Sequence, residues 1–342
     1  MVQVVGKKLT LNTGVLPYDL NTPLFTDYAH KLRTVWMPAG KPASYSATET
    51  FDFPVGTILS KTFYYPRVPG GAAASLTLRQ TYDDKQDFAG EGLDLDRVRL
   101  IETRLLVRRA DGWVALPYVW NAEQTEATLA RTGDRTELEL VSDDGKRQNL
   151  AYVVPNENQC ASCHVTNVKS KAFQPIGPKA RHLNRDYPYA SGTENQLARL
   201  VRAGYLTGAP VSDLPRAANW RDESATLVAR ARAYLDVNCA HCHNPTGPAN
   251  TTALTLNPFV PGDRSVGVCK PPVAAGKGTG DRLFDIVPGQ ADASIMIYRM
   301  ASTEGGVMMP ELGRTSVHAE GVALLRQWIN AMPGECTEKS RP

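Results

Sequence analysis

The chain has 342 residues, more than one hydrophobic core usually serves, so two domains are expected. Hydrophobic residues make up 42% of it and charged residues 21%, and its 24 prolines and 27 glycines indicate a globular protein with many turns. The formal net charge of +3 is too small to predict binding to nucleic acid or to an anionic membrane surface.

The sequence shows neither a membrane-spanning segment nor an export signal. No stretch approaches the roughly 18 uninterrupted apolar residues that a spanning helix needs. Residues 1–7 lack the basic and then apolar layout of a signal peptide. We therefore expect a mature chain that does not span a membrane and from which the signal has been removed.

Apolar side chains alternate with polar ones along several segments of the first half, which is the pattern of half-buried antiparallel strands. Two pairs of these segments flank the turns Asp111-Gly112 and Asp144-Gly145, which favour hairpins. We therefore predict an antiparallel β-rich domain over residues 1–190. The expected strands lie within residues 51–63, 76–82, 101–107, 114–120, 138–140 and 150–152.

Two copies of Cys-x-x-Cys-His, at residues 160–164 and 239–243, carry the clearest chemistry. Two thiols three positions apart on a helical turn reach the two vinyl groups of one haem, and the next residue brings an imidazole under the iron. In a chain with six cysteines and six histidines, two such segments arise by chance in roughly a few sequences per million. We therefore predict two covalently attached c-type haems, bound by Cys160, Cys163, Cys239 and Cys242, with His164 and His243 as iron ligands.

Three other uses of these cysteines are disulfides, a zinc site and a thioredoxin-like redox pair. A zinc site built from four cysteines leaves the histidine after each pair without a role, and a redox pair is normally single. Covalent haem attachment takes place outside the cytoplasm, so the motifs predict a periplasmic protein.

The second half is expected to contain a helix before the second motif, around residues 227–235, and a last helix around 322–329. Together with Met309-Pro310 these features resemble the class I cytochrome c family. The resemblance implies an all-α domain over residues 191–342 and a thioether as sixth iron ligand. The methionine directly before proline is Met309, and the alternatives are Met308 or no methionine ligand.

The first half resembles a different group, the β-rich c-type cytochromes that include the lysine-crosslinked haem enzymes of ammonia oxidisers and their nitric oxide binding relatives. Residues 53–61, Gly112-Trp113 and the first motif carry this resemblance. It places Lys61 at the position of the cross-linking lysine, although a strand lysine is usually a solvated charge.

A third resemblance covers nearly all of the chain. Residues 16–20 and 267–272, with the Met-Met-Pro segment, are similar to an uncharacterised proteobacterial family of di-haem c-type cytochromes. This family carries no known reaction, so the resemblance implies two haems and no substrate.

The distal ligand of the first haem stays open. Between the two motifs there is no methionine, and His182 is the only histidine. His182, His30, His318 and Met37 are candidates, although a lone histidine is more often a hydrogen-bonded structural residue. If none of them binds, the iron is five-coordinate.

The two remaining cysteines, Cys269 and Cys336, are predicted to form a disulfide, because exported proteins fold in oxidising surroundings. The alternative is a pair of buried thiols.

Two functions fit two haems. In the first, the chain carries electrons between periplasmic donor and acceptor proteins, which requires no further residues. In the second, it is a redox enzyme whose five-coordinate first haem acts on peroxide, nitric oxide or hydroxylamine, with the second haem as relay. The sequence assigns no catalytic residue, and electron transfer is the simpler expectation.

Overall fold

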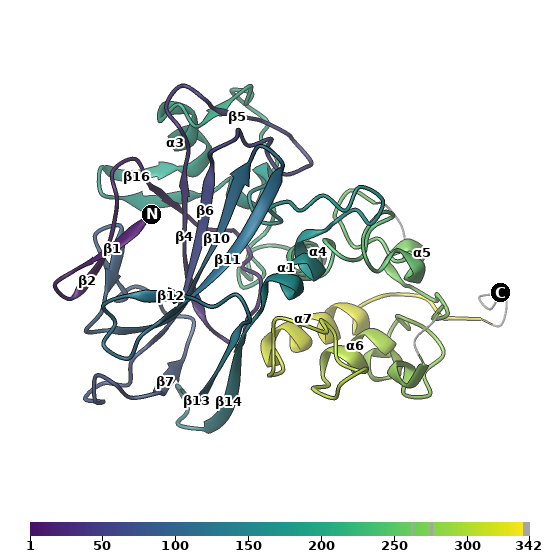
Figure 1. Cartoon of the computed structure of the whole chain (residues 1–342). Coiled ribbons are helices and arrows are strands. Elements are labelled where there is room, and N and C mark those ends of the chain that lie inside the picture. Colours follow the sequence, from purple (N-terminus) through teal and green to yellow (C-terminus); the bar gives the residue numbers. More distant parts are fainter. Residues whose placement is uncertain (261–262, 274–275, 338–342) are drawn as a thin grey trace. The chain divides into compact units, whose positions relative to one another are not determined.

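The computed structural model describes residues 1–260, 263–273 and 276–337 (Figure 1). In this part of the chain strands take 30% of the residues and helices 19%, and the seven α-helices are short. The chain forms two compact units, each assembled from separate stretches. Unit 1 comprises Met1–Asn21, Tyr28–Ala161 and Phe173–Arg216, and unit 2 comprises Thr22–Asp27, Ser162–Ala172 and the residues from Ala217 onwards.

The expected all-α class I cytochrome c domain over residues 191–342 is wrong. That stretch includes strand β17 (Leu206–Thr207) and most of its residues lie outside helices. The described residues between 245 and 280 form only helices of three or four residues. Prolines and glycines are frequent there, and both residue types destabilise helix interiors.

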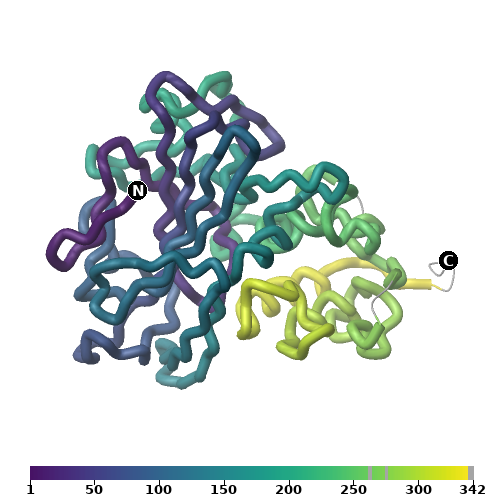
Figure 2. The backbone as a smooth tube through the Cα atoms, viewed as in Figure 1, coloured from purple at the N-terminus to yellow at the C-terminus, as the bar shows by residue number. Residues whose placement is uncertain are grey.

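Unit 1 is built on a six-stranded sheet with strand order β12-β11-β10-β6-β4-β3 (Figure 1). Its longest hairpin, β10–β11, is the one predicted from the Asp111-Gly112 turn, and it pairs Val107 with Val114. The two strands run side by side in the ribbon and in the backbone tube (Figure 2). The strands are β3 (Leu16–Tyr18), β4 (His30–Trp36), β6 (Ile58–Pro66), β10 (Val98–Arg109), β11 (Gly112–Trp120) and β12 (Ala127–Leu129).

The predicted strand over residues 51–63 starts only at Ile58. Pro54 has no amide hydrogen for a strand ladder, and Gly56 adopts a φ of 98°, which other residues rarely reach. A Cβ atom on Gly56 would also lie 2.7 Å from Pro38, so the turn needs glycine.

A second predicted hairpin is also observed, since β13 and β14 pair on either side of the Asp144-Gly145 turn. β7 extends this sheet by pairing in parallel with β13. The strands of this sheet are β7 (Thr77–Gln80), β13 (Asp134–Ser142) and β14 (Arg147–Val154). The remaining elements of unit 1 are short: β1 (Val2–Val5), β2 (Lys8–Leu11), β8 (Phe88–Ala89), β9 (Gly92–Asp94), β5 (Ala43–Ser44), α2 (Ala180–Leu183), β15 (Asp186–Tyr189), β16 (Gly192–Asn195) and α3 (Gln196–Arg202).

The six-stranded sheet has two faces of different chemistry, because side chains alternate along each strand. One face contributes Leu32, Tyr64 and Leu100 to an apolar core that they share with Leu9 and Leu93. The opposite face is polar at its centre, where charged side chains surround the ring of Phe63. A partly buried polar face of this kind is unusual in a sheet.

Unit 2 centres on the contact between its two longest helices, α4 (Leu227–Asn238) and α7 (Ala319–Asn330). A Cβ atom on Gly321 would lie 2.4 Å from the Tyr234 hydroxyl, so glycine permits the close approach of the two helices. Its other helices are α5 (Asp263–Val266), α6 (Ile295–Met300), η1 (Asn250–Thr252), η2 (Gly276–Thr279) and η3 (Ala291–Ala293).

Six residues from the N-terminal part of the chain complete unit 2. The carboxylate of Asp27 accepts hydrogen bonds from the amides of Thr315 (2.9 Å) and Ser316 (2.8 Å). The hydroxyl of Thr22 donates to the backbone oxygen of Ala218 over 2.8 Å. The Asp27 bonds join residues 288 and 289 positions apart and the Thr22 bond residues 196 positions apart, which no local sequence pattern indicates.

The predicted disulfide between Cys269 and Cys336 is confirmed, with a Cα–Cα distance of 5.2 Å. It closes a loop of 67 positions within unit 2. Among the described residues, no helix is both long enough and apolar enough to cross a membrane.

Candidate haem-attachment sites

The first motif lies on α1 (Glu157–His164), whose start is fixed by a reciprocal pair of hydrogen bonds. The side chain of Asn156 accepts from the amide of Gln159 (2.8 Å), and the side chain of Gln159 accepts from the amide of Asn156 (3.0 Å). This arrangement satisfies amides that a helix start leaves without partners. It fixes the helical turn on which Cys160 and Cys163 lie, as attachment of both thiols to one haem requires.

The second motif follows α4 rather than lying on it. Thr226 caps the start of α4, its hydroxyl accepting from the amide of Ala229 over 3.2 Å. The helix ends at Asn238, and the chain then turns, with the amide of His243 donating to the backbone oxygen of Cys239 (2.9 Å).

The imidazole of His243 is held in one tautomer. Its Nδ1 atom lies 3.2 Å from the hydroxyl oxygen of Thr252, and that hydroxyl donates to the backbone oxygen of Ala249 over 2.7 Å. Because the hydroxyl hydrogen is used, the threonine oxygen accepts the Nδ1 hydrogen of His243. The Nε2 atom is then unprotonated and carries the lone pair that an iron ligand needs.

The same histidine is kept neutral. Burial, assisted by the positive charges of Arg299 and Lys270, lowers the pKa of His243 to about 4. Lys270 is itself buried and pairs with Asp285 over 3.0 Å. At neutral pH His243 is therefore the unprotonated base that coordination to iron requires.

The four motif cysteines are not disulfide-bonded, which argues against structural disulfides in the motifs. Burial is the main cause that raises the pKa of Cys239 and of Cys242 to about 12. Both are thus protonated thiols at neutral pH, unlike the activated thiolate of a redox-active pair. A shared zinc site would gather three or more ligands, and within the described ranges no such group of His, Cys, Asp or Glu is found.

The segments that follow the two motifs lie against each other within unit 2. The sulfur of Cys242 lies 3.7 Å from the backbone oxygen of Ser162. The amide of Val168 donates to the backbone oxygen of Thr246 over 2.8 Å. The second cysteines of both motifs are also electrostatically coupled, since Cys163 contributes to the raised pKa of Cys242. Within unit 2 the structure therefore brings the second cysteine of the first motif, Cys163, close to that of the second motif, Cys242.

The Met-Pro segment is positioned by two arginines. The amide of Met309 donates to the backbone oxygen of Arg299 (3.0 Å), and the buried Arg314 donates to the backbone oxygen of Met309 (2.9 Å). Arg299 also lowers the pKa of His243, so its charge acts on the imidazole. The choice between Met309 and Met308 as sixth ligand stays a prediction, since both side chains are partly buried.

Two of the four candidate distal ligands of the first haem have structural roles. His30 uses both ring nitrogens, with Nδ1 2.9 Å from Asp87 and Nε2 2.7 Å from the backbone oxygen of Thr81. His318 bonds through Nδ1 to the hydroxyl of Tyr234 (2.8 Å) and stacks on Phe25 at 4.1 Å. Both ring nitrogens of His30 and the Nδ1 atom of His318 are thus engaged within the protein.

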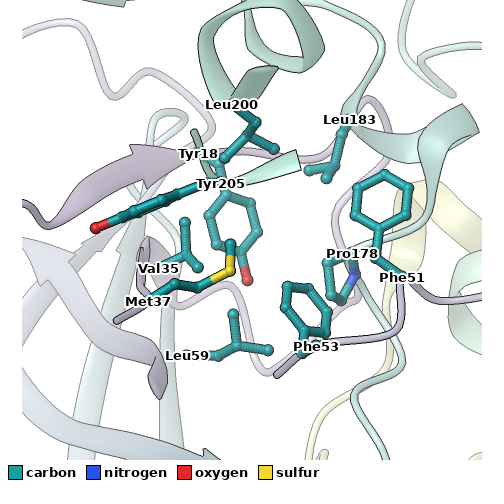
Figure 3. Close-up of a pocket in the computed structure, with 10 residues that line it drawn as sticks. All are labelled: Tyr18, Val35, Met37, Phe51, Phe53, Leu59, Pro178, Leu183, Leu200 and Tyr205. Carbon is teal, nitrogen blue, oxygen red and sulfur yellow. The ribbon is translucent and has the colours of Figure 1, made fainter. Parts of the chain in front are cut away.

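The other two candidates are buried in unit 1. The sulfur of Met37 points into a small apolar pocket lined by aromatic and aliphatic side chains (Figure 3). His182 lies in α2 and is 1% exposed. Both stay predicted candidates for the distal ligand of the first haem. The pocket residues drawn with Met37 are Tyr18, Val35, Phe51, Phe53, Leu59, Pro178, Leu183, Leu200 and Tyr205.

Lys61, the position of the cross-linking lysine in the resemblance, lies on β6 with its ammonium 5.7 Å from the centre of the Phe63 ring. Its side chain is partly buried rather than solvated, so the expectation of an ordinary surface lysine is wrong for this residue. The cross-link itself stays a prediction.

No known protein family, curated protein or solved structure matches this chain. The haem assignment therefore depends on the two motifs and on the groups around them. The thiols, the neutral imidazole and its fixed tautomer fit a covalently bound haem at the second motif. Thr252, Arg299 and Lys270, which provide this fit, were missed by sequence reasoning because no motif links them to His243.

Proposed function

We propose that the chain is an exported two-haem c-type cytochrome that carries electrons between periplasmic donor and acceptor proteins. The observation that carries this proposal is the contact between the two motif segments in unit 2, where Cys242 lies 3.7 Å from Ser162. When bound, the two haems would each supply an iron that changes between the ferric and ferrous states.

The chain's own residues support the proposal in three ways. His243 is held neutral with Nε2 unprotonated, as an axial ligand must be. Cys163 and Cys242, each one bond from its haem after attachment, are neighbours, which favours direct electron exchange. The disulfide between Cys269 and Cys336 fits the oxidising compartment in which haem attachment takes place.

The test starts with the full chain, matured in a periplasm. Pyridine haemochrome absorbance and protein mass should give two haems per chain. Rapid injection of one electron should then be followed by redistribution between the haems at a rate that does not depend on protein concentration. One haem per chain, or redistribution that requires collisions between molecules, would overturn the proposal.

A second candidate function is a redox enzyme whose first haem binds a small molecule such as peroxide, nitric oxide or hydroxylamine. The observation in its favour is that His30 and His318 are both engaged elsewhere. The resemblance of the β-rich half to nitric oxide binding cytochromes also supports it.

Adding carbon monoxide to the fully reduced protein decides between the two functions. One carbon monoxide binding site per chain favours the enzyme. No binding in the native chain but one site in His182→Ala favours electron transfer through a bis-histidine haem.

A further inference from the structure

We propose that Arg314 is a positioning residue that holds residues 299–316, hereafter the methionine loop, in the form in which the sulfur of Met309 can bind the iron of the second haem. The inference rests on the proposed function and on the predicted thioether ligand. Arg314 acts through the backbone of the loop, to which its guanidinium is hydrogen-bonded.

The guanidinium of Arg314 is buried and gathers backbone oxygens from the whole methionine loop. Arg314 is 5% exposed, and its Nη1 atom donates to the backbone oxygen of Ser316 over 2.9 Å. Its Nη2 atom has two hydrogens, and its two shortest contacts are to the backbone oxygens of Ser302 (2.8 Å) and Met309 (2.9 Å). One planar group therefore joins the beginning, the middle and the end of the loop. Longer contacts of the same atom reach the backbone oxygens of Arg299 (3.4 Å) and Met300 (3.3 Å).

These acceptors are neutral, although the donor carries a charge. Burial lowers the pKa of Arg314, and the negative charges of Tyr234 and Asp27 counteract this effect. A guanidinium nevertheless stays protonated in proteins, and its hydrogen bonds are stronger than those of a neutral donor. Because a buried charge adds little net stability, we attribute to Arg314 the selection of one loop conformation.

Both polar groups of the Met309 backbone are held by this arrangement. Its amide donates to the backbone oxygen of Arg299 (3.0 Å), and its own oxygen accepts from Arg314 (2.9 Å). The side chain of Arg299 also donates to the backbone oxygen of Val307 over 2.8 Å. The backbone of the predicted ligand is thus fixed on both sides, and the side-chain torsions aim the sulfur.

Arg314 is itself anchored from outside the loop. The buried carboxylate of Asp27 accepts from the amides of Thr315 (2.9 Å) and Ser316 (2.8 Å) and from the hydroxyl of Ser316 (2.7 Å). The two residues that follow Arg314 are therefore fixed to the segment Thr22–Asp27. A positioning group needs such a support, because a mobile arginine could not hold the loop in place.

The methionine loop lies within electrostatic reach of the second motif. Burial is the main cause that lowers the pKa of His243, and the charge of Arg299 adds to it. Burial likewise raises the pKa of Cys242, and the charge of Glu311 contributes. Arg299 begins the loop and Glu311 comes two residues after Met309. The two flanks of the predicted ligand therefore both act on the motif that would hold the second haem.

The experiment compares the native chain with Arg314→Met, which removes the charge and the hydrogen bonds, and with Arg314→Lys. A lysine keeps the charge, but its ammonium cannot replace the planar fork that reaches several oxygens at once. The matched control is Arg326→Met on α7, where Arg326 is partly exposed and pairs with Asp292. Thermal melting confirms that each variant is folded, and haem content per chain is measured for all of them.

Both Arg314 variants should lose the weak sulfur-to-iron band of the ferric second haem, lower its reduction potential and allow carbon monoxide to bind it when reduced. A lower potential in Arg314→Lys reports the lost ligand, because the charge is kept. Hydrogen exchange of the Met309 amide should become at least about tenfold faster, as the loss of a hydrogen bond to a charged group predicts. The potential of the first haem, and every readout in Arg326→Met, should stay native.

A chain with two haems in which both Arg314 variants keep the native band and potential would overturn the positioning role and leave the cytochrome proposal intact. A lowered melting temperature with an unchanged band and potential would have the same meaning, since it shows a purely structural role. If Met309→Ala keeps the band, Met309 is not the ligand and the role of Arg314 is overturned with it. A chain without a haem at the second motif would instead overturn the cytochrome proposal, and with it the ligand role.

Discussion

The two Cys-x-x-Cys-His segments have the same chemistry but lie in different local structure. The first ends a helix whose start is fixed by Asn156 and Gln159. The second follows α4 in a series of turns, and its imidazole is oriented by Thr252. The five-residue motif therefore specifies attachment, while the properties of the axial imidazole depend on residues outside it.

The charges around the two motifs also differ. At the second motif the charges of Arg299 and Lys270 act on His243, and the backbone oxygen of Arg299 accepts a hydrogen bond from the amide of Met309. At the first motif Arg104 is electrostatically coupled to Cys160. We therefore expect two haems held at these motifs to differ in their properties.

The largest expected effect tests whether the two attachment sites are independent. Cys239→Ala combined with Cys242→Ala should remove one haem per chain and leave the other, because each motif supplies its own two thiols. Pyridine haemochrome per milligram of protein measures this. The control is Cys269→Ala with Cys336→Ala, which should keep both haems. Loss of both haems from the motif variant would show that the first site forms only after the second.

The next largest expected effect concerns the stability that the disulfide gives to unit 2. Cys269→Ser with Cys336→Ser should lower the free energy of unfolding by roughly 4 kcal/mol, the chain-entropy value for a loop of 67 positions. Urea unfolding followed by the absorbance of the second haem measures it. Chemical reduction of the native chain should give the same loss. A loss below about 1 kcal/mol would mean that the unfolded chain gains little freedom when the bridge is removed.

A smaller expected effect tests Met309 as the sixth iron ligand of the second haem. Met309→Ala should abolish the weak sulfur-to-iron absorption band of the ferric protein and lower the potential of that haem, because a thioether ligand raises it. Met308→Ala should do neither. Reversed behaviour of the two variants would place the ligand one residue earlier.

Local sequence patterns predicted the strands and helices better than their assembly. The Asp-Gly turns correctly indicated the hairpins β10–β11 and β13–β14, because the turn and the alternating side chains act over a few residues. Helices α4 and α7 were also placed correctly. The all-α domain was wrong because few residues between these helices are helical and residues 22–27 complete the unit from far away in the sequence.

Local sequence patterns likewise predicted only part of each candidate site. The motifs predict the six attachment and proximal residues, since the chemistry is contained in five consecutive positions. Thr252 and Arg299 reach His243 only through the fold. Such features have no signature in a single sequence.

The smallest expected effect isolates the hydrogen bond that distinguishes the second imidazole. Thr252→Val keeps the shape of the side chain and removes the oxygen that accepts the Nδ1 hydrogen of His243. That hydrogen bond makes the imidazole a stronger electron donor, which stabilises ferric iron. Its loss, at about 1 kcal/mol for one hydrogen bond, should raise the potential of the second haem by about 40 mV. Potentiometric titration measures this, with the first haem as internal reference and Thr252→Ser, which keeps the hydroxyl, as control. A lower potential in Thr252→Val, or equal shifts at both haems, would show that Thr252 supports the fold around residues 249–254 rather than the electronic state of His243.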